Sequence, residues 1–374
     1  MLNNSTQRNF GLDVIRSFAI LMVLIGHLIP DNTINKSLFS MAMIFRGFGV
    51  ELFFVLSGFL IGKILIHLLN KGLNVSNIKN FYIRRWLRTL PLYYLVFAIY
   101  IIIYKFTNPP INIFPDFFLL KQLFFIQNFD IRHMHFFNQS WSLSVEEWFY
   151  LLMPMLLVMF CNNKTKLEHL YKNLIKIIIF IALIRFFYVL GFNPADSDFG
   201  IRRCIPLRFD ALLTGVLFAC LKINNKEIFN KLLNKKFLII SFIILVLIII
   251  DFYCLYFIKN PFNNLLNLVF YKSFYFTIIP FSFAFLIIFF ENNEFINKKL
   301  SKILPIKYFF EKTSLYSYSM YLFNLLVMFL FDVLFVKFYH SPVLISMYFI
   351  SLYLISAFVY RYYEKPIMRF RDKF

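Results

Sequence analysis

An arginine and a histidine, Arg16 and His27, stand in a largely apolar stretch from Gly11 to Pro30. On an α-helix, their spacing corresponds to about 20° in direction and about 16 Å along the axis. Both side chains therefore point the same way from opposite ends of one helix. A guanidinium group binds phosphate oxygens and an imidazole takes up a proton near neutral pH, so the two residues could serve different steps of one reaction. The alternative is that Arg16 snorkels to a membrane interface and that His27 only forms a hydrogen bond between helices.

Further ionisable side chains lie at the ends of other apolar stretches, in two groups. The group on the side of His27 consists of Glu51, Glu146, Glu147, Arg208 and Asp210. The group on the side of Arg16 consists of Arg84, Arg85, Arg88, Arg361 and Arg369. An arginine cluster suits a phosphate-bearing donor, whereas a histidine beside carboxylates suits a base that is oriented by a carboxylate and deprotonates a hydroxyl.

Some residues of these two groups could have a structural role instead of a chemical one. The arginines of the third apolar stretch, Arg84, Arg85 and Arg88, could set membrane topology alone. Glu146 and Glu147 are adjacent, so they lie about 100° apart on a helix and we expect only one of them to face the protein interior.

The composition places these residues in a membrane protein. Of the 374 residues, 60% are hydrophobic and 21% are aromatic, and apolar runs recur along the whole chain. Proteins with several transmembrane helices have this pattern and soluble domains do not. The formal net charge of +20 does not indicate nucleic acid as a partner, because the cations lie in short patches between apolar runs.

Ten apolar segments approach the roughly 20 residues that a helix needs to cross a bilayer. They are 11–29, 47–69, 89–106, 145–161, 174–192, 207–222, 237–258, 268–290, 315–336 and 343–360. The segment 117–129 is shorter and contains Lys121, which favours an interfacial or re-entrant position. The sequence thus predicts an all-α polytopic membrane protein of about ten transmembrane helices, with residues 1–374 in a single domain.

Basic residues gather in alternate connections between these segments. The cation-rich connections contain Lys71, Lys79, Arg84, Arg85 and Arg88; Lys164, Lys166, Lys172 and Lys176; Lys222, Lys226, Lys231, Lys235 and Lys236; Lys298, Lys299, Lys302, Lys307 and Lys312; and Arg361, Lys365, Arg369, Arg371 and Lys373. The others contain few, such as Lys36 and Arg46, Lys259, or Lys337. Cytoplasmic loops carry an excess of Lys and Arg, so both termini are predicted to be cytoplasmic and His27 to lie toward the outside.

The cysteines and the first segment indicate no additional site. Cys161, Cys204, Cys220 and Cys254 lack CxxC or metal-type spacing, so we expect inert thiols and no metal. The first apolar segment contains Arg16 and ends without a small-residue cleavage site, which predicts a permanent span instead of a signal peptide.

Seven short motifs, in order across nearly the whole chain, resemble those of the acyltransferase 3 family of integral membrane acyltransferases. They are LDVIRSFAILMVLIGH, which contains Arg16 and His27, then GVELFFVLSGFLIG, FYIRRWLRTLPLYY, WSLSVEEWFYL, RFDALLTG, SLYSYSMYLFN and YRYYEKP. Each motif alone is weak, but seven in sequence are specific. Asn324 departs from the family pattern, which often has a histidine there, so we assign that position no role in proton transfer.

The resemblance implies transfer of an acyl group, commonly acetyl, from cytoplasmic acyl-CoA to a hydroxyl of a glycan or other cell-envelope acceptor outside a bacterial plasma membrane. The implied catalytic residues are His27, as the base, with Glu146 and Glu147. The implied donor-binding residues are Arg16, Arg84, Arg85 and Arg88. We assign acceptor binding to Glu51, Trp141, Arg208 and Asp210. An interfacial belt position is the alternative for Trp141 and Trp148.

The expected mechanism is direct transfer. His27 removes a proton from the acceptor hydroxyl, the oxygen attacks the thioester, and coenzyme A leaves toward the cytoplasm, so a narrow passage should lead to His27 from that side. A covalent intermediate on Ser142 or Ser144 is less favoured, because neither lies in a recognisable activated setting. Many family members carry a C-terminal extracytoplasmic hydrolase-like domain. We expect none here, and transfer either by this chain alone or with a separate extracytoplasmic partner protein.

Two other functions are compatible with the residues. A transporter of a glycan or lipid-linked intermediate would also have many spans and buried charges, but it would not need coenzyme A. A scaffold within a polysaccharide assembly would tolerate removal of charge at His27 and Glu147. The expected partners are acyl-CoA, a glycan or cell-envelope acceptor and membrane lipid.

Overall fold

Helices form the described part of the chain. The computed structural model describes residues 8–29, 36–72, 74–107, 116–129, 137–160, 168–192, 198–257, 265–335 and 338–373, and no strand occurs among them. The longer helices are α1 (Phe10–Leu28), α2 (Lys36–Asn70), α3 (Val75–Thr107), α5 (Ser140–Phe160), α7 (Leu170–Phe192), α8 (Phe209–Asn224), α10 (Lys235–Phe257), α11 (Leu265–Asn292), α12 (Leu304–Leu334) and α13 (Pro342–Val359). The shorter ones are α4 (Asp116–Leu123), η1 (Gln127–Phe129), η2 (Asp198–Arg202), η3 (Ile205–Leu207), α9 (Lys226–Leu232), η4 (Phe295–Lys299), η5 (Leu300–Lys302), η6 (Phe338–His340), η7 (Tyr360–Glu364) and α14 (Lys365–Arg371).

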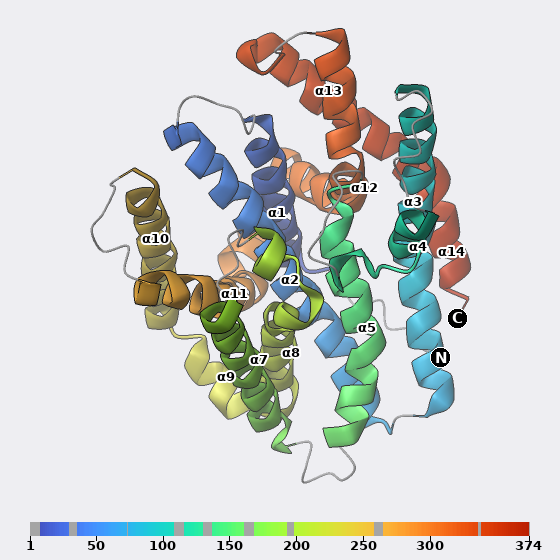
Figure 1. Cartoon of the computed structure of the whole chain (residues 1–374). Helices are drawn as coiled ribbons and strands as arrows, with labels where there is room; N and C mark the ends of the chain where they lie inside the picture. The colour runs from blue at the N-terminus through green and yellow to red at the C-terminus, as the bar shows by residue number, and fades with distance from the viewer. Residues whose placement is uncertain are drawn as a thin grey trace.

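Eight of the described helices are long and apolar enough to cross a membrane, and the bent pair Lys226–Leu232 and Lys235–Ile250 would make nine. The predicted span 207–222 corresponds to α8, which has 16 residues and is buried along most of its length. This helix is shorter than the roughly 20 residues of a usual span. The prediction of an all-helical, multi-pass protein is therefore confirmed, with eight to nine candidate spans among the described residues where about ten were predicted. In Figure 1, α1 and α3 end toward the upper edge of the bundle, whereas α2 and α5 end toward the lower edge.

Three helices begin well before the apolar segments that predict them. α2 begins at Lys36 instead of 47, α3 at Val75 instead of 89, and α12 at Leu304 instead of 315. Hydropathy detects only the residues that favour hydrocarbon, whereas helical hydrogen bonding continues through polar residues beyond it. Residues that we expected in connections, such as Arg46 and Arg84, therefore lie within helices.

The segment 117–129 does not form a transmembrane helix, as expected. It contains α4 and η1, joined through Phe125, whose φ of 58° is uncommon for a residue with a side chain. The Tyr93 hydroxyl donates to Gln122 O at 2.9 Å, and Trp148 Nε1 donates to Phe125 O at 3.1 Å. These bonds attach the segment to α3 and α5. Trp148 thus has a hydrogen-bond partner within the protein. The alternative of a position in the interfacial belt did not predict this bond.

Glycines bring α2 into close contact with α8. A Cβ atom at Gly58 would lie 2.0 Å from Leu212 O, and one at Gly215 would lie 2.1 Å from Val55 O. Small residues at such contacts allow the backbones of membrane helices to approach one another closely. α2 makes its most extensive contacts with α8 and α1 and crosses the middle of the bundle (Figure 1). The second and fifth of the seven motifs thus contain the glycines that hold the central helices together.

We expect Gly58→Ala to destabilise the bundle, because backbone atoms of Leu212 obstruct the added methyl and cannot rotate away. Overpacking of this kind typically costs about 1–3 kcal/mol. The control is Gly47→Ala in the same helix, where no atom lies within 4 Å. It should leave stability unchanged or raise it by up to about 1 kcal/mol. The free energy of unfolding in mixed detergent and SDS micelles measures both, and equal stabilities for the two variants would contradict the packing described here.

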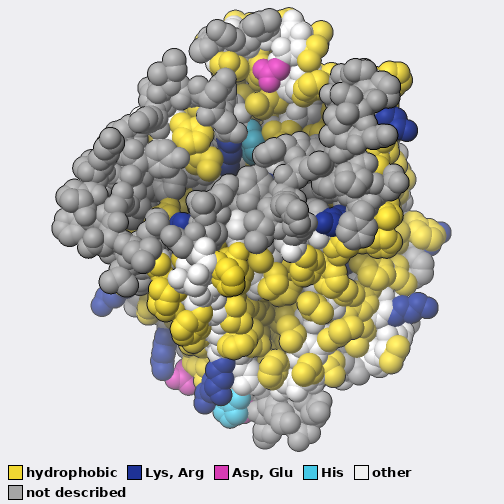
Figure 2. Space-filling view, in the orientation of Figure 1, with side chains coloured by type: hydrophobic (Ala, Val, Ile, Leu, Met, Phe, Trp, Pro, Cys, Tyr) yellow, Lys and Arg dark blue, Asp and Glu magenta, His cyan; other side chains and the backbone are white. Residues whose placement is uncertain are grey.

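Hydrophobic side chains cover the outward faces of several helices. Phe187, Phe242 and Leu354, on three different helices, are each more than 60% exposed. Figure 2 shows such side chains spread over the face below the undescribed residues, with Lys and Arg side chains along its lower border. An apolar surface of this extent suits contact with lipid hydrocarbon.

Candidate active site

His27 lies in the last turn of α1, where its own helix orients the ring. Its Nδ1 atom is 2.7 Å from the carbonyl oxygen of Val23, one turn earlier. A carbonyl oxygen only accepts hydrogen bonds, so Nδ1 carries the proton of the neutral ring and Nε2 carries the lone pair. Nε2 is therefore the atom that can take a proton from a substrate. We expected a carboxylate to orient the ring, whereas the acceptor at Nδ1 is a backbone carbonyl.

Arg16 lies near the other end of α1, in a polar cluster between α1 and α12. Its Nη1 atom donates to Ser314 Oγ at 3.3 Å and is 4.0 Å from Asp13 Oδ1. Asp13 has closer partners, because Arg8 Nε lies 2.5 Å from Oδ2 and Ser314 donates to Oδ1 at 2.6 Å. The Arg16 side chain is 21% exposed. Among the described residues, Arg16 thus has only this distant carboxylate contact, so its guanidinium group keeps the capacity to bind an anion.

Two of the three arginines in the first half of α3 lie near Arg16. Arg85 and Arg88 interact electrostatically with Arg16 and with each other. Arg84 is exposed, and its Nη2 atom is 3.5 Å from Asp372 Oδ1. Arg84 lies about 100° from Arg85 around the axis of α3 but only about 40° from Arg88, so its contact with Asp372, and not its direction alone, distinguishes it from them. We call Arg16, Arg85 and Arg88 the inner arginine group, and Arg84, which we expected to belong with them, lies outside it.

Both carboxylates of the α5 motif face the protein interior, so the expectation that only one would do so was wrong. Glu146 accepts hydrogen bonds from Ser57 at 3.1 Å and from Tyr150 at 2.8 Å. Glu147 is buried and interacts electrostatically with the side chain of Thr89. Ser57 belongs to α2 and Thr89 to α3, so α5 is covered on two sides. Two adjacent residues can then both be interior.

The carboxylates and the inner arginine group form one electrostatic cluster. Arg85 interacts with both Glu146 and Glu147, and Arg88 interacts with Glu146. Arg88 also interacts with Glu364, in the turn η7 between α13 and α14. The sequence analysis did not identify Glu364 as a site residue, although it belongs to the motif YRYYEKP.

Trp141 is buried at the start of α5, with two arginines over its ring. The Cζ atoms of Arg202 and Arg203 lie 4.8 Å and 5.8 Å from the ring centroid. Tyr321 interacts electrostatically with Arg202 and with Glu146, so it links this group to the carboxylates. Trp141 therefore faces protein groups and not a lipid interface. The sequence analysis missed Arg202 and Arg203, which no motif contains.

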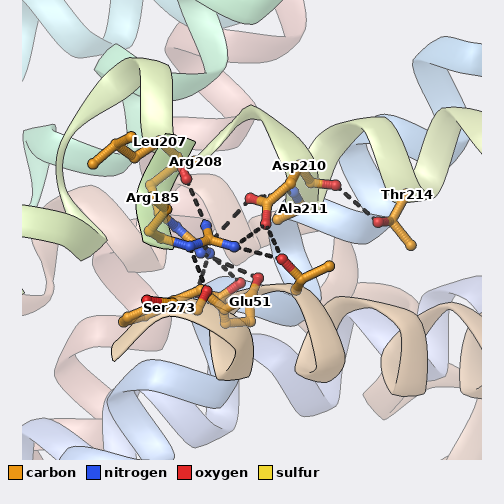
Figure 3. Close-up of polar contacts among 10 residues, drawn as sticks. Glu51, Arg185, Leu207, Arg208, Asp210, Ala211, Thr214 and Ser273 are labelled. Carbon is orange, nitrogen blue, oxygen red and sulfur yellow. Dashed lines mark hydrogen bonds and ion pairs between the residues drawn. The ribbon is translucent and has the colours of Figure 1, made fainter. Parts of the chain in front are cut away.

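Glu51, Arg208 and Asp210 lie together in a buried ion network with Arg185, shown in Figure 3. Arg208 Nη2 donates to both carboxylate oxygens of Glu51, at 2.5 Å for Oε2, and its Nη1 atom is 3.8 Å from Asp210 Oδ1. Arg185 Nη2 is 2.7 Å from Asp210 Oδ2, and its Nη1 atom donates to Leu207 O at 2.6 Å. Two guanidinium groups and two carboxylates thus balance one another.

The network also reaches α11. Arg185 Nε donates to Ser273 O at 2.6 Å, and the Cζ atom of Arg208 lies 4.6 Å from the centroid of the Phe276 ring. The network therefore joins α7 and α11 to α2 and to the start of α8. Its four charged side chains are at most 3% exposed. These contacts favour a role in holding helices together over direct contact with an acceptor.

Arg185 is the member of the network that sequence reasoning missed. It stands alone within the predicted span 174–192, and a single ionisable residue in a span is itself a sign of a buried pair or a site. The sequence does not indicate its partner, because Asp210 is 25 positions away on another helix.

The structure describes the side chains of two of the four cysteines. Cys204 and Cys220 are present as thiols, and burial raises the pKa of the Cys204 thiol. Among the described residues, no group of three or more His, Cys, Asp or Glu side chains is placed to hold a metal ion. The following residues that entered the sequence analysis lie outside the described part: Pro30, Cys161, Lys164, Lys166, Lys259 and Lys337, and the side chains of Lys36 and Cys254.

Comparison with known proteins finds relatives that are named as O-acetyltransferases and one that is uncharacterized. OatA, a peptidoglycan O-acetyltransferase of Listeria monocytogenes, is 32% identical over 209 residues, which cover 51% of this chain and 31% of OatA. YrhL of Bacillus subtilis, a putative peptidoglycan O-acetyltransferase, is 32% identical over 161 residues, which cover 40% of this chain and 23% of YrhL. An uncharacterized protein of Haemophilus influenzae is 30% identical over 237 residues, which cover 56% of this chain and 88% of that protein.

The matched region thus spans about a third or less of the two relatives that are named as acetyltransferases. No solved structure matches the chain. The family model described as "Acyltransferase domain" matches residues 9–361, which is nearly the whole chain. The protein is therefore a multi-pass membrane member of the acyltransferase 3 family, whose named relatives are O-acetyltransferases.

Proposed function

We propose that this protein transfers an acetyl group from acetyl-CoA in the cytoplasm to a hydroxyl group of a cell-envelope glycan on the opposite side of a bacterial plasma membrane. The observation that carries the proposal is α1. This helix contributes Arg16 to the inner arginine group and carries the oriented imidazole of His27 at its other end. The names of OatA and YrhL support acetyl as the group and a cell-wall glycan as the acceptor.

The proposed topology has ten spans with both termini in the cytoplasm. It counts α8 and the bent pair α9 and α10 as spans, in addition to the eight long helices. The basic residues at the inner ends of α2, α5, α8 and α11 support this orientation. In this topology the inner arginine group faces the cytoplasm and His27 faces outward.

In the proposed donor site, the inner arginine group binds the phosphates of acetyl-CoA. Guanidinium groups bind phosphate oxygens in a bidentate manner, and three of them in one place form a strong anion site. The electrostatic contact of Arg85 with Glu146 and Glu147 supports a role for these carboxylates in holding the arginines in position. Arg84, which pairs with Asp372, has no part in this proposal.

In the proposed reaction, Nε2 of His27 accepts the proton of the acceptor hydroxyl while the oxygen attacks the thioester carbonyl. The carbon–sulfur bond then breaks, the imidazolium returns its proton to sulfur, and coenzyme A leaves as the thiol. Trp141, with Arg202 and Arg203 over its ring, is the candidate contact for the acceptor on the outer side. Direct transfer is supported because the hydroxyls of the alternative nucleophiles bond to groups that are not bases: Ser142 to Tyr321, and Ser144 to Gln127.

The experiment that tests the proposal supplies acetyl-CoA with a labelled acetyl group to purified protein in lipid nanodiscs, with peptidoglycan fragments as the acceptor. We expect mass spectrometry to detect an O-acetyl ester on the glycan and free coenzyme A in equal amounts. Movement of unmodified glycan without release of coenzyme A would instead identify a transporter.

Replacement of Arg16 by Ala should weaken the binding of acetyl-CoA about 10- to 100-fold, because a hydrogen bond to a charged group contributes about 1.5–3 kcal/mol. The measurement is the rise in thermal unfolding temperature on addition of acetyl-CoA, which depends on the dissociation constant. Lys298→Ala, at an exposed lysine paired with Glu294, is the control and should keep the full rise. An undiminished rise for Arg16→Ala would exclude Arg16 from the donor site.

A further inference from the structure

Arg46, on α2, holds the C-terminal end of α1. Its Nε atom donates to Gly26 O at 2.6 Å and its Nη2 atom donates to Ile29 O at 2.7 Å. These two carbonyls lie on either side of His27 in the sequence. The last carbonyls of a helix lack donors within the helix and carry partial negative charge, so a cation that bonds to two of them restrains the final turn.

Two glycines bring α2 against the same turn of α1. A Cβ atom at Gly26 would lie 2.7 Å from Arg46 Cγ, so this glycine leaves space for the aliphatic part of the arginine. A Cβ atom at Gly49 would lie 2.6 Å from Val23 Cγ2, so the second glycine lets α2 contact Val23. The carbonyl of Val23 is the acceptor for His27 Nδ1. Contacts from α2 therefore restrain both the turn that carries His27 and the residue that orients its ring.

We infer that Arg46 is the positioning residue for His27, which it restrains through the backbone of α1. The inference rests on the proposed function, in which His27 is the base. A base acts efficiently only when its lone pair points at the proton that it removes, and a displacement of about 1 Å can lower a rate by about 100-fold. The sequence analysis noted Arg46 only as a cation in a connection that should contain few. Its bonds to the end of α1 give this cation a specific structural role.

The alternative is that Arg46 stabilises the fold without affecting the base. The two roles predict different kinetics. A positioning residue acts through His27, so its removal lowers kcat only while His27 is present and leaves the KM for acetyl-CoA unchanged. A residue that only stabilises the fold lowers the amount of active protein by the same factor whether or not His27 is present.

The experiment is a double-mutant cycle with Arg46→Met and His27→Ala, measured as acetyl transfer by purified protein in nanodiscs. We expect Arg46→Met to lower kcat about 10- to 100-fold, with an unchanged KM for acetyl-CoA, and to cause no further loss in His27→Ala. Arg46→Lys should recover part of the loss, because an ammonium group donates to one carbonyl but cannot bridge both in the same geometry. Gly47→Ala, the adjacent position on α2, is the control and should keep full activity. If Arg46→Met does not fold, Arg46→Gln takes its place.

Two results would overturn the inference. The first is a wild-type kcat in Arg46→Met. The second is an equal proportional loss in the presence and absence of His27. Wild-type turnover by His27→Ala alone would instead overturn the assignment of His27 as the base, and with it this inference. The experiment therefore distinguishes an error in the proposed mechanism from an error in the role of Arg46.

Discussion

His27→Ala is expected to lower kcat for acetyl transfer by about 10²- to 10⁴-fold, the usual contribution of a general base. The reason is the ring geometry. The bond from Nδ1 to Val23 O leaves the lone pair on Nε2, so no other atom of the side chain can take the proton of the acceptor. Binding of acetyl-CoA should persist, because Arg16 lies about 16 Å away along the same helix. Single-turnover transfer and thermal stabilisation by acetyl-CoA measure the two effects separately.

Two further variants make this prediction specific. His27→Gln keeps hydrogen-bonding groups but cannot accept a proton, so it should lose as much activity as His27→Ala. His67→Ala, at an exposed histidine on α2, is the control and should retain wild-type kcat. In the wild type, activity should be lost under acidic conditions that protonate His27, because a protonated ring cannot act as a base. Normal turnover by His27→Gln would exclude proton transfer to this residue.

The parts of the site that the sequence predicts are those within a single helix. The spacing of Arg16 and His27 fixes their relative direction on α1 before any tertiary contact forms. The length of the apolar runs likewise predicts most of the spans, because a bilayer imposes the same length on each of them. These features depend only on helix geometry and on the thickness of the bilayer. They can therefore be predicted without knowledge of the neighbouring helices.

The parts that the sequence did not predict depend on how helices face one another. Whether Glu146 and Glu147 are both interior depends on α2 and α3 covering two sides of α5. The partner of Arg185 depends on the crossing of α7 with α8. Helix rotation and crossing are set by the packing of the whole bundle. No spacing within one segment encodes them.

α2 is the element that connects the separate parts of the molecule. It carries Arg46 at the end of α1, Glu51 in the buried ion network and Ser57 beside Glu146. Gly58, on the same helix, sets the contact with α8. A change in the position of α2 would thus move the base, the α5 carboxylate and the ion network together. The stability of the network therefore bears directly on the geometry of the site.

Arg185→Met should lower the free energy of unfolding by about 3–5 kcal/mol, since removal of one partner leaves a buried charge uncompensated. The uncompensated group is Asp210, whose other guanidinium contact, to Arg208, is longer at 3.8 Å and is shared with Glu51. Lys298→Met, which removes an exposed pair, should cost less than about 1 kcal/mol. Unfolding in mixed detergent and SDS micelles gives both values.

The double variant Arg185→Met with Asp210→Leu decides whether charge balance is the cause. It removes one cation and one anion and leaves the neutral pair of Glu51 and Arg208 in place. Replacement of a whole buried ion pair by apolar side chains is often neutral or stabilising. We therefore expect the double variant to regain most of the stability that either single variant loses. A double variant as unstable as the sum of the two single ones would show instead that the hydrogen bonds of Arg185 to Leu207 O and Ser273 O provide the stabilisation.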